Sequence, residues 1–237
     1  MKTAIIFARV VFIICLPILL FTSSIALAFN SLWLYSNGFV KYDIGAVTGI
    51  SQPELNEAAR ALITYWNSGE EYINVVVEKD GQPFTLFNER EVIHLKDVKA
   101  LVRLDYIALV TTGLLVVALT AFAFWYRRPV YRLELAGAGF GGGVLSLGIL
   151  VAVGAMVLAD FDGFWTQFHL LSFANDLWLL DPSRDYLIMM FPEGFWFDSV
   201  IVVAGLMAFL ALLIGVLAWL YLRKHRLQVD NGASPTP

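Results

Sequence analysis

Long apolar runs alternate with polar segments along the chain, and this alternation gives the first structural prediction. A helix that crosses a hydrocarbon core about 30 Å thick needs about 20 consecutive apolar residues. Four runs reach that length, at about residues 5–29, 102–125, 136–158 and 199–222. We therefore expect an all-α integral membrane protein, a four-transmembrane-helix bundle that forms a single membrane domain over residues 1–237.

The first run also has features of a signal peptide, since Lys2 precedes it and Ala26-Leu27-Ala28 imitates a cleavage site. Its apolar stretch is longer than the roughly 7 to 15 residues of a signal-peptide core, and Arg9 interrupts it. We therefore expect a retained helix, with the Arg9 guanidinium reaching the inner surface of the membrane.

Cationic residues beside the spans give the predicted orientation, because Lys and Arg in short connections stay in the cytoplasm. They cluster between the second and third runs and after the fourth, as Arg127, Arg128, Arg132, Arg223, Lys224 and Arg226. We expect both termini to be cytoplasmic. The two larger polar segments, about residues 30–101 and 159–198, would then form an extracytoplasmic cap.

The first polar segment has the pattern of a small α+β structure. Ser51-Gln52-Pro53-Glu54 has the form of a capping box and predicts a helix that ends near Ser68. Residues 72–77 and 84–87 have the composition of strands, and Asp80-Gly81 between them predicts a hairpin turn.

A second capping pattern follows the hairpin, with Asn88 as the cap and Glu91 three residues later. No proline interrupts residues 89–126, so we expect one helix that starts outside the membrane and continues into the second span. His94 lies near the outer end of this helix.

The third run contains seven glycines between Gly137 and Gly154. Small residues let membrane helices approach one another closely, so this pattern favours a central, tightly packed helix. A phosphate-binding glycine loop does not fit a position inside an apolar span.

The amino-acid composition limits the classes of function and partner that the protein can have. The chain is 59% hydrophobic and 15% charged, and we expect membrane lipids rather than nucleic acid as its partners. Cys15 is the only cysteine, which excludes an internal disulfide, and its place in the middle of a span makes a catalytic thiol improbable.

Two of the three histidines, His94 and His169, lie in polar, aromatic-rich segments that the predicted topology places at one membrane surface. Imidazole titrates near neutral pH, so such a pair can serve as a base and an acid. Each histidine has acidic neighbours, Glu91 and Asp97 for the first and Asp176 for the second. These carboxylates either orient the rings or are helix caps and solvated charges.

Other chemistries remain open on the same residues. Two histidines with Asp97 or Asp176 would suffice for a metal-dependent membrane hydrolase, although no closely spaced pair of histidines is present. Ser51 and Ser172 lack the Gly-x-Ser-x-Gly pattern of an activated serine. A non-enzymatic membrane scaffold is the remaining alternative, and the absence of buried acid chains argues against a transporter.

The surroundings of the two histidines resemble a known family. His94 lies in residues 87–99, FNEREVIHLKDVK, and His169 lies shortly before residues 175–182, NDLWLLDP. With Phe191-Pro192-Glu193, these segments are similar to the bacterial lipoprotein intramolecular transacylase family, Lit, and the resemblance covers essentially the whole chain.

The resemblance implies a membrane acyltransferase of the bacterial plasma membrane, with its active site at the extracytoplasmic face. Such enzymes act on mature lipoproteins whose N-terminal cysteine carries an S-linked diacylglyceryl group. They move the sn-2 acyl chain onto the α-amine of the same cysteine, which gives the lyso-form N-acyl lipoprotein. Donor and acceptor are one molecule, so no enzyme nucleophile, cofactor or metal is expected.

The resemblance also implies the site. His94 and His169 would share general acid and base catalysis, with the division of roles open. Residues expected to orient groups or bind substrate, some of them by donating to an oxyanion, are Asn88, Arg90, Glu91, Asp97, Asn175, Asp176 and Trp178. The expected aromatic pocket consists of Phe87, Trp165, Phe168, Phe173 and Phe191.

Overall fold

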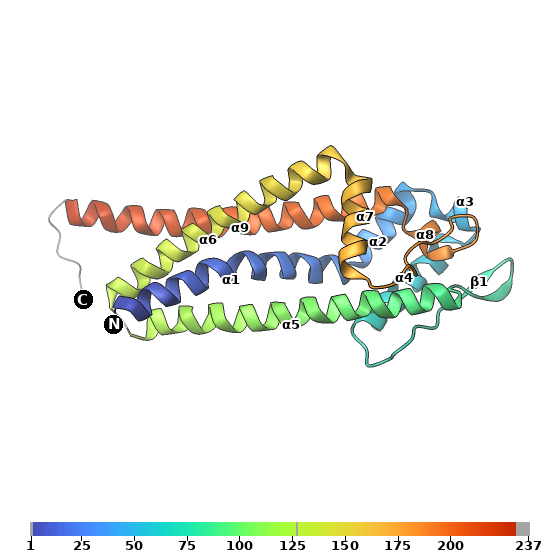
Figure 1. The fold of residues 1–237 in the computed structure, drawn as a ribbon, viewed down its shortest axis with the longest axis horizontal. Helices are drawn as coiled ribbons and strands as arrows, with labels where there is room; N and C mark the ends of the chain where they lie inside the picture. The colour runs from blue at the N-terminus through green and yellow to red at the C-terminus, as the bar shows by residue number, and fades with distance from the viewer. Residues whose placement is uncertain (1, 127, 231–237) are drawn as a thin grey trace. The chain divides into compact units, whose positions relative to one another are not determined.

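The structure of the protein is a computed structural model that describes residues 2–126 and 128–230 (Figure 1). Four helices are long and apolar enough to cross a membrane: α1 (Lys2–Phe29), α5 (Glu89–Trp125), α6 (Pro129–Ala159) and α9 (Glu193–Asp230). The predicted all-α membrane fold with a small α+β portion is confirmed. The orientation of the termini stays a prediction, and Arg127, one of the residues on which it rests, lies outside the described residues.

The chain divides into two compact units. The first unit comprises residues 1–24, 107–155 and 204–237, and the second comprises residues 25–106 and 156–203. The long helices α1, α5, α6 and α9 each contribute residues to both units.

Close packing of α6 against α1 and α9 organises the first unit. A Cβ added at Gly142 would lie 2.8 Å from the Leu16 side chain of α1, and one at Gly143 would lie 2.9 Å from the Ala211 carbonyl oxygen of α9. Glycine at these two positions therefore allows the helices to approach, as the glycine-rich third run predicted. Large apolar side chains cover the outside of this unit, where Leu114 is 66% exposed and Val117 65%. Such a surface suits contact with lipid.

Short elements pack around an aromatic and aliphatic core in the second unit. They are α2 (Leu32–Lys41), α3 (Ile44–Thr48), α4 (Gln52–Trp66), α7 (Phe161–Ser172) and α8 (Tyr186–Met190), with strands β1 (Val76–Lys79) and β2 (Gln82–Thr85). The core joins residues of α2, α4, α8 and the first turn of α9, among them Phe39, Leu55, Met190 and Phe195. The core also includes Leu95 of α5 and Leu187 of α8, and so holds the elements that carry several of the polar candidates.

The hairpin forms around the predicted turn, but its strands are Val76–Lys79 and Gln82–Thr85 and overlap the predicted residues 72–77 and 84–87 only in part. Asp80 and Gly81 adopt positive φ angles of 54° and 76°, and the two strands pair antiparallel around them. The helix after Ser51 forms, but the Ser51 side chain makes no capping hydrogen bond. The predicted capping box is therefore wrong, because the Glu54 carboxylate accepts a hydrogen bond from the backbone N–H of Glu78 in β1 instead, at 2.7 Å.

The second predicted capping box does form. The Asn88 side-chain oxygen accepts from the Glu91 backbone N–H at 3.2 Å, and the Glu91 carboxylate accepts from the Asn88 N–H at 2.7 Å. These two bonds satisfy free N–H groups at the start of α5. The helix continues for 37 residues, about 55 Å, which exceeds the roughly 30 Å of a hydrocarbon core. Its polar first turns, with His94, therefore need not lie in lipid.

Candidate active site

Two histidines from different helices face each other in the second unit. His94 lies in the second turn of α5, and His169 lies in the last turn of α7. Their ring centroids are 6.3 Å apart, with 27° between the ring planes. The residues are 6% and 9% exposed. The fold thus brings together the two residues on which the sequence analysis concentrated.

The two imidazoles differ in their hydrogen bonds. Nδ1 of His169 lies 2.8 Å from the carbonyl oxygen of Trp165, one turn earlier in α7. A carbonyl only accepts, so Nδ1 carries the proton and Nε2 keeps a lone pair. Nδ1 of His94 is buried and has no hydrogen-bond partner among the described residues. Buried N–H groups without acceptors are rare, so we infer that neutral His94 carries its proton on Nε2.

Burial also sets the charge of the site. It lowers the pKa of His169 below the ordinary value of 6.5, and the hydrogen bond to Trp165 offsets this effect only in part. His169 is therefore neutral at neutral pH, with its Nε2 lone pair available to accept a proton.

Aromatic rings surround the histidines. The Trp178 ring centroid lies 4.8 Å from that of His169, and the Phe173 centroid lies 5.1 Å from that of His94. Four aromatic residues among those singled out from the sequence contribute: Trp165, Phe168, Phe173 and Trp178. Such a wall excludes water and favours an apolar chain.

The aromatic cluster extends further than the sequence analysis indicated. Trp165 stacks on Phe161 at 5.8 Å, on Phe168 at 5.1 Å and on Trp196 of α9 at 4.9 Å. Phe161, Trp165 and Phe168 follow a helical i, i+4, i+7 spacing, which could have identified Phe161. Nothing in the local sequence indicates Trp196, because its contact is tertiary.

The polar residues between the two histidine segments bond to one another. The Asn175 side chain donates to the Asp97 carboxylate at 2.9 Å, and the Trp178 indole N–H donates to the Asn175 backbone oxygen at 3.1 Å. Arg90 donates through Nη2 to the backbone oxygen of Asp176. These contacts fasten the 173–180 segment to α5. Within residues 2–126 and 128–230, no hydrogen bond joins a carboxylate to either imidazole, and a backbone carbonyl orients His169 instead.

Asn88 and Glu91 hold a different segment. The Asn88 amide donates to Asp185 at 2.9 Å, and the Glu91 carboxylate accepts from the Leu187 backbone N–H at 2.6 Å. Asp185 also accepts from the Asp181 N–H at 2.7 Å. Glu91 and Asp185 are 0% and 1% exposed. Both residues therefore anchor the start of α8 to the start of α5, rather than contact a histidine.

Phe87 and Phe191, which the sequence analysis assigned to the aromatic pocket, belong to the core of the second unit. They are 4% and 6% exposed. The Phe191 ring lies 5.7 Å from Phe39 and 5.8 Å from Tyr35, both in α2. Their contribution to the site is to support the segments around it.

A sequence model of the family described as lipoprotein intramolecular transacylase Lit matches residues 10–196. The matched range covers most of the chain, including both histidine segments. The chain belongs to the Lit family. This membership makes it a membrane acyltransferase of the lipoprotein-modifying class.

Solved structures agree with the Lit fold. The in meso structure of the membrane-integral lipoprotein intramolecular transacylase Lit from Bacillus cereus matches with a TM-score of 0.79 at 18% identity, covering 96% of this chain and 100% of that one. Two further structures of the B. cereus protein carry a histidine-to-arginine and a histidine-to-alanine substitution. They match at 18% identity with TM-scores of 0.75 and 0.74, covering 96% and 95% of this chain and 96% and 97% of theirs. A comparison with curated proteins gave no match.

The sequence analysis missed one buried polar residue, Asp185, which accepts hydrogen bonds from Asn88 and Asp181. Asp185 is not among the residues singled out from the sequence, although it stands directly before the helical residues Tyr186–Met190, at a position that acids often occupy. The described part of the chain contains no group of three or more His, Cys, Asp or Glu side chains placed to hold an ion.

Proposed function

We propose that this Lit family member moves the sn-2 acyl chain of an S-diacylglyceryl cysteine onto the α-amine of that same cysteine. The substrate is the lipid-modified N-terminal cysteine of a mature lipoprotein, and the product is its lyso-form, N-acylated counterpart. The active site lies at the extracytoplasmic face of the bacterial plasma membrane. The enzyme uses no cofactor, because donor and acceptor are parts of one molecule.

The reaction moves one proton as well as one acyl group. The amine nitrogen attacks the ester carbonyl carbon, a C–N bond forms, and the C–O bond to the glyceryl oxygen breaks. The nitrogen must lose a proton and the departing oxygen must gain one. A site with one proton acceptor and one proton donor side by side meets this need.

The observation that carries the proposal is that His169 and His94 are adjacent and differ in the hydrogen bonds of their Nδ1 atoms, from which opposite tautomers follow. His169 presents the Nε2 lone pair because its Nδ1–H donates to Trp165. His94 presents Nε2–H because its buried Nδ1 has no acceptor. We assign the base to His169 and the acid to His94. After one turnover His169 holds an extra proton and His94 lacks one, and the 6.3 Å between the ring centroids favours the transfer that resets the pair.

Arg90 is the best candidate donor to the oxyanion of the tetrahedral intermediate. The amide nitrogens of Asn88 and Asn175, the two alternatives, already donate to Asp185 and Asp97. Arg90 uses Nη2 on Asp176 and leaves Nε without a partner. A guanidinium one helical turn before His94 can stabilise negative charge that develops next to the acid.

The test is conversion of a synthetic diacylglyceryl lipopeptide by the purified full chain, followed by mass spectrometry. Replacement of His94 or His169 by Ala should each lower the rate by about 10² to 10⁴-fold, since each removes one proton transfer. His225→Ala is the matched control and should keep full activity. Full activity in either His94→Ala or His169→Ala would overturn the assignment.

The same assay separates transfer from hydrolysis. Intramolecular transfer conserves the mass of the lipopeptide and blocks its amine, whereas a metal-dependent hydrolase would release a free fatty acid and would stop in a chelator. We expect an N-acylated product of unchanged mass and full activity in a chelator.

A further inference from the structure

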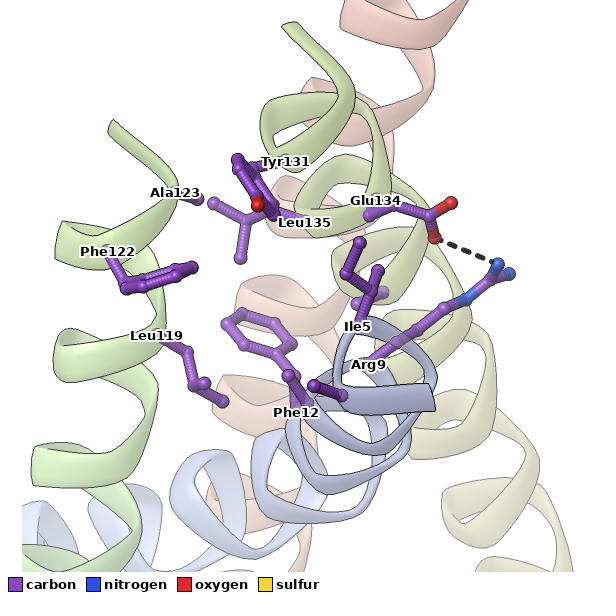
Figure 2. A pocket seen from close by; sticks show the side chains of 12 residues that line it. Ile5, Arg9, Phe12, Leu119, Phe122, Ala123, Tyr131, Glu134 and Leu135 are labelled. Carbon is purple, nitrogen blue, oxygen red and sulfur yellow. Dashed lines mark hydrogen bonds and ion pairs between the residues drawn. The ribbon is translucent and has the colours of Figure 1, made fainter. Parts of the chain in front are cut away.

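The first unit contains a pocket that the proposed reaction does not use. It lies among the N-terminal part of α1, the C-terminal part of α5 and the N-terminal part of α6, and its volume is about 330 Å³ (Figure 2). The pocket exists because small side chains line it on all three helices, namely Ala4, Ala8, Ala123 and Ala138. A volume of this size is within the range of pockets that bind small molecules, about 300 to 1,000 Å³.

The lining is apolar except for the Tyr131 hydroxyl and one ion pair (Figure 2). Phe12 and Phe122 face the space from α1 and α5, while Arg9 and Glu134 form an ion pair on the side away from α5 (Figure 2). The Arg9 Nη1 and the Glu134 Oε2 are 3.3 Å apart. An acyl chain is the ligand that fits such walls, because fatty chains surround these helices in the membrane.

The ion pair selects the headgroup of that lipid. Arg9 lies inside the first apolar run and Glu134 just before the start of the third, and a charged residue in an apolar span is costly and is kept for a partner or a function. The Arg9 and Glu134 side chains remain 48% and 38% exposed, so both have hydrogen-bonding capacity beyond their mutual contact. A headgroup with a phosphate and a primary ammonium would match this pair of charges in reverse, with phosphate beside Arg9 and ammonium beside Glu134.

We propose that the pocket binds one acyl chain of a phosphatidylethanolamine, with its headgroup held by the Arg9–Glu134 pair. An anionic phospholipid without an ammonium would place its phosphate near Glu134, and its headgroup would have no cation to bind the Glu134 carboxylate. A choline headgroup carries a cation but no N–H donor for the carboxylate. The site is therefore selective for one class of lipid and is separate from the substrate of the acyl transfer.

The charge part of the proposal is tested by native mass spectrometry of the delipidated full chain. The probes are phosphatidylethanolamine, phosphatidylcholine and phosphatidylglycerol with the same acyl chains, offered in equal amounts. We expect phosphatidylethanolamine to bind in preference by about twofold to fivefold, the effect of partly exposed charge pairs. Glu134→Gln should remove the preference, and Arg9→Gln should weaken binding of all three lipids. Arg223→Gln is the control for loss of a cation elsewhere and should change nothing.

The pocket part is tested by filling the space. Ala8→Leu on α1 and Ala123→Leu on α5 should each reduce phosphatidylethanolamine binding by about tenfold, because a larger side chain occupies the volume of the acyl chain. Ala121→Leu is the matched control, since Ala121 is an exposed residue of the same helix outside the pocket lining. Two independent filling variants guard against misfolding of one of them. Equal binding of the three lipids, or unchanged binding in Ala8→Leu, would overturn the proposal.

Discussion

At the scale of single residues, one backbone carbonyl distinguishes two otherwise similar histidines. The Trp165 oxygen fixes the proton of His169 on Nδ1, and no equivalent acceptor reaches Nδ1 of His94. The proposed base and acid therefore differ by their surroundings and not by their chemistry. This difference leads to a pH dependence.

The pKa of His169 is lowered from 6.5 by burial, so the base is lost only when the pH falls below that value. The substrate amine, with an ordinary pKa of about 8, must also be deprotonated. The logarithm of the rate should rise with a slope of one between about pH 6.5 and 8, and should steepen to a slope of two at lower pH. A pH–rate profile on the lipopeptide measures this, and steepening that begins above pH 6.5 would contradict a depressed pKa.

The sequence could single out the two histidine segments that the fold brings together, but not which atoms their side chains use. His94 and His169 could be found because polar groups in aromatic surroundings stand out. The hydrogen bond between Asn175 and Asp97 joins residues 78 positions apart, so no local sequence pattern predicts it. The sequence left Glu91 open as a helix cap or as a partner of His94, and its carboxylate accepts from two backbone N–H groups, one of them in the predicted cap.

At the scale of the elements, residues at the start of α5 both cap their own helix and hold the start of α8. Glu91 accepts from its own helix through Asn88 and from α8 through Leu187. One buried carboxylate thus links the helix that carries His94 to the segment that follows the aromatic loop.

Glu91→Gln replaces one acceptor oxygen by an amide donor that faces a backbone N–H. An unsatisfied buried donor costs about 1–3 kcal/mol. We expect a lower melting temperature and a lower kcat with little change in KM, and faster hydrogen exchange in residues 181–190. Glu57→Gln is the control, because Glu57 is exposed and paired only with Arg60. If hydrogen exchange in residues 181–190 is unchanged, the anchoring role is wrong.

A second element-level prediction concerns the contact of α6 with α9. Gly143→Ala would place a methyl group 2.9 Å from the Ala211 carbonyl oxygen, and overpacking of this kind costs about 1–3 kcal/mol. Gly148→Ala meets no atom within 4 Å and should leave stability unchanged or slightly higher. Melting temperatures of the purified variants compare the two, and equal values would show that the close approach is unimportant.

The elements themselves were largely predictable. Asp80-Gly81 fixed the hairpin because the turn requires positive φ, and Asn88 with Glu91 fixed the start of α5. The Ser51 capping box failed because Glu54 found a competing donor in β1, which the sequence of α4 alone does not contain.

At the scale of the whole molecule, four apolar spans accompany a fold that is shared at low sequence identity. The B. cereus structure shares this fold at 18% identity. Apolar length is a constraint that many sequences satisfy, so the architecture could be predicted from hydrophobic runs. Orientation depends on a few cationic residues and needs an experiment.

The predicted topology can be tested by cysteine labelling in intact cells. Cys15→Ser removes the only cysteine, and Asp80→Cys or Lys224→Cys then introduces one reactive site. A membrane-impermeant maleimide should label the Asp80→Cys variant from outside and the Lys224→Cys variant only after lysis. Labelling of the Lys224→Cys variant in intact cells would reverse the orientation.

The placement of two indoles beside His169 has a consequence for observing the enzyme. Trp165 and Trp178 lie 5.0 Å and 4.8 Å from the imidazole, and they are two of the seven tryptophans in the chain. A protonated imidazole quenches the fluorescence of an adjacent indole. The proposed proton acceptor therefore carries its own optical reporter, and a change in its charge during turnover alters the emission of the protein without any added dye.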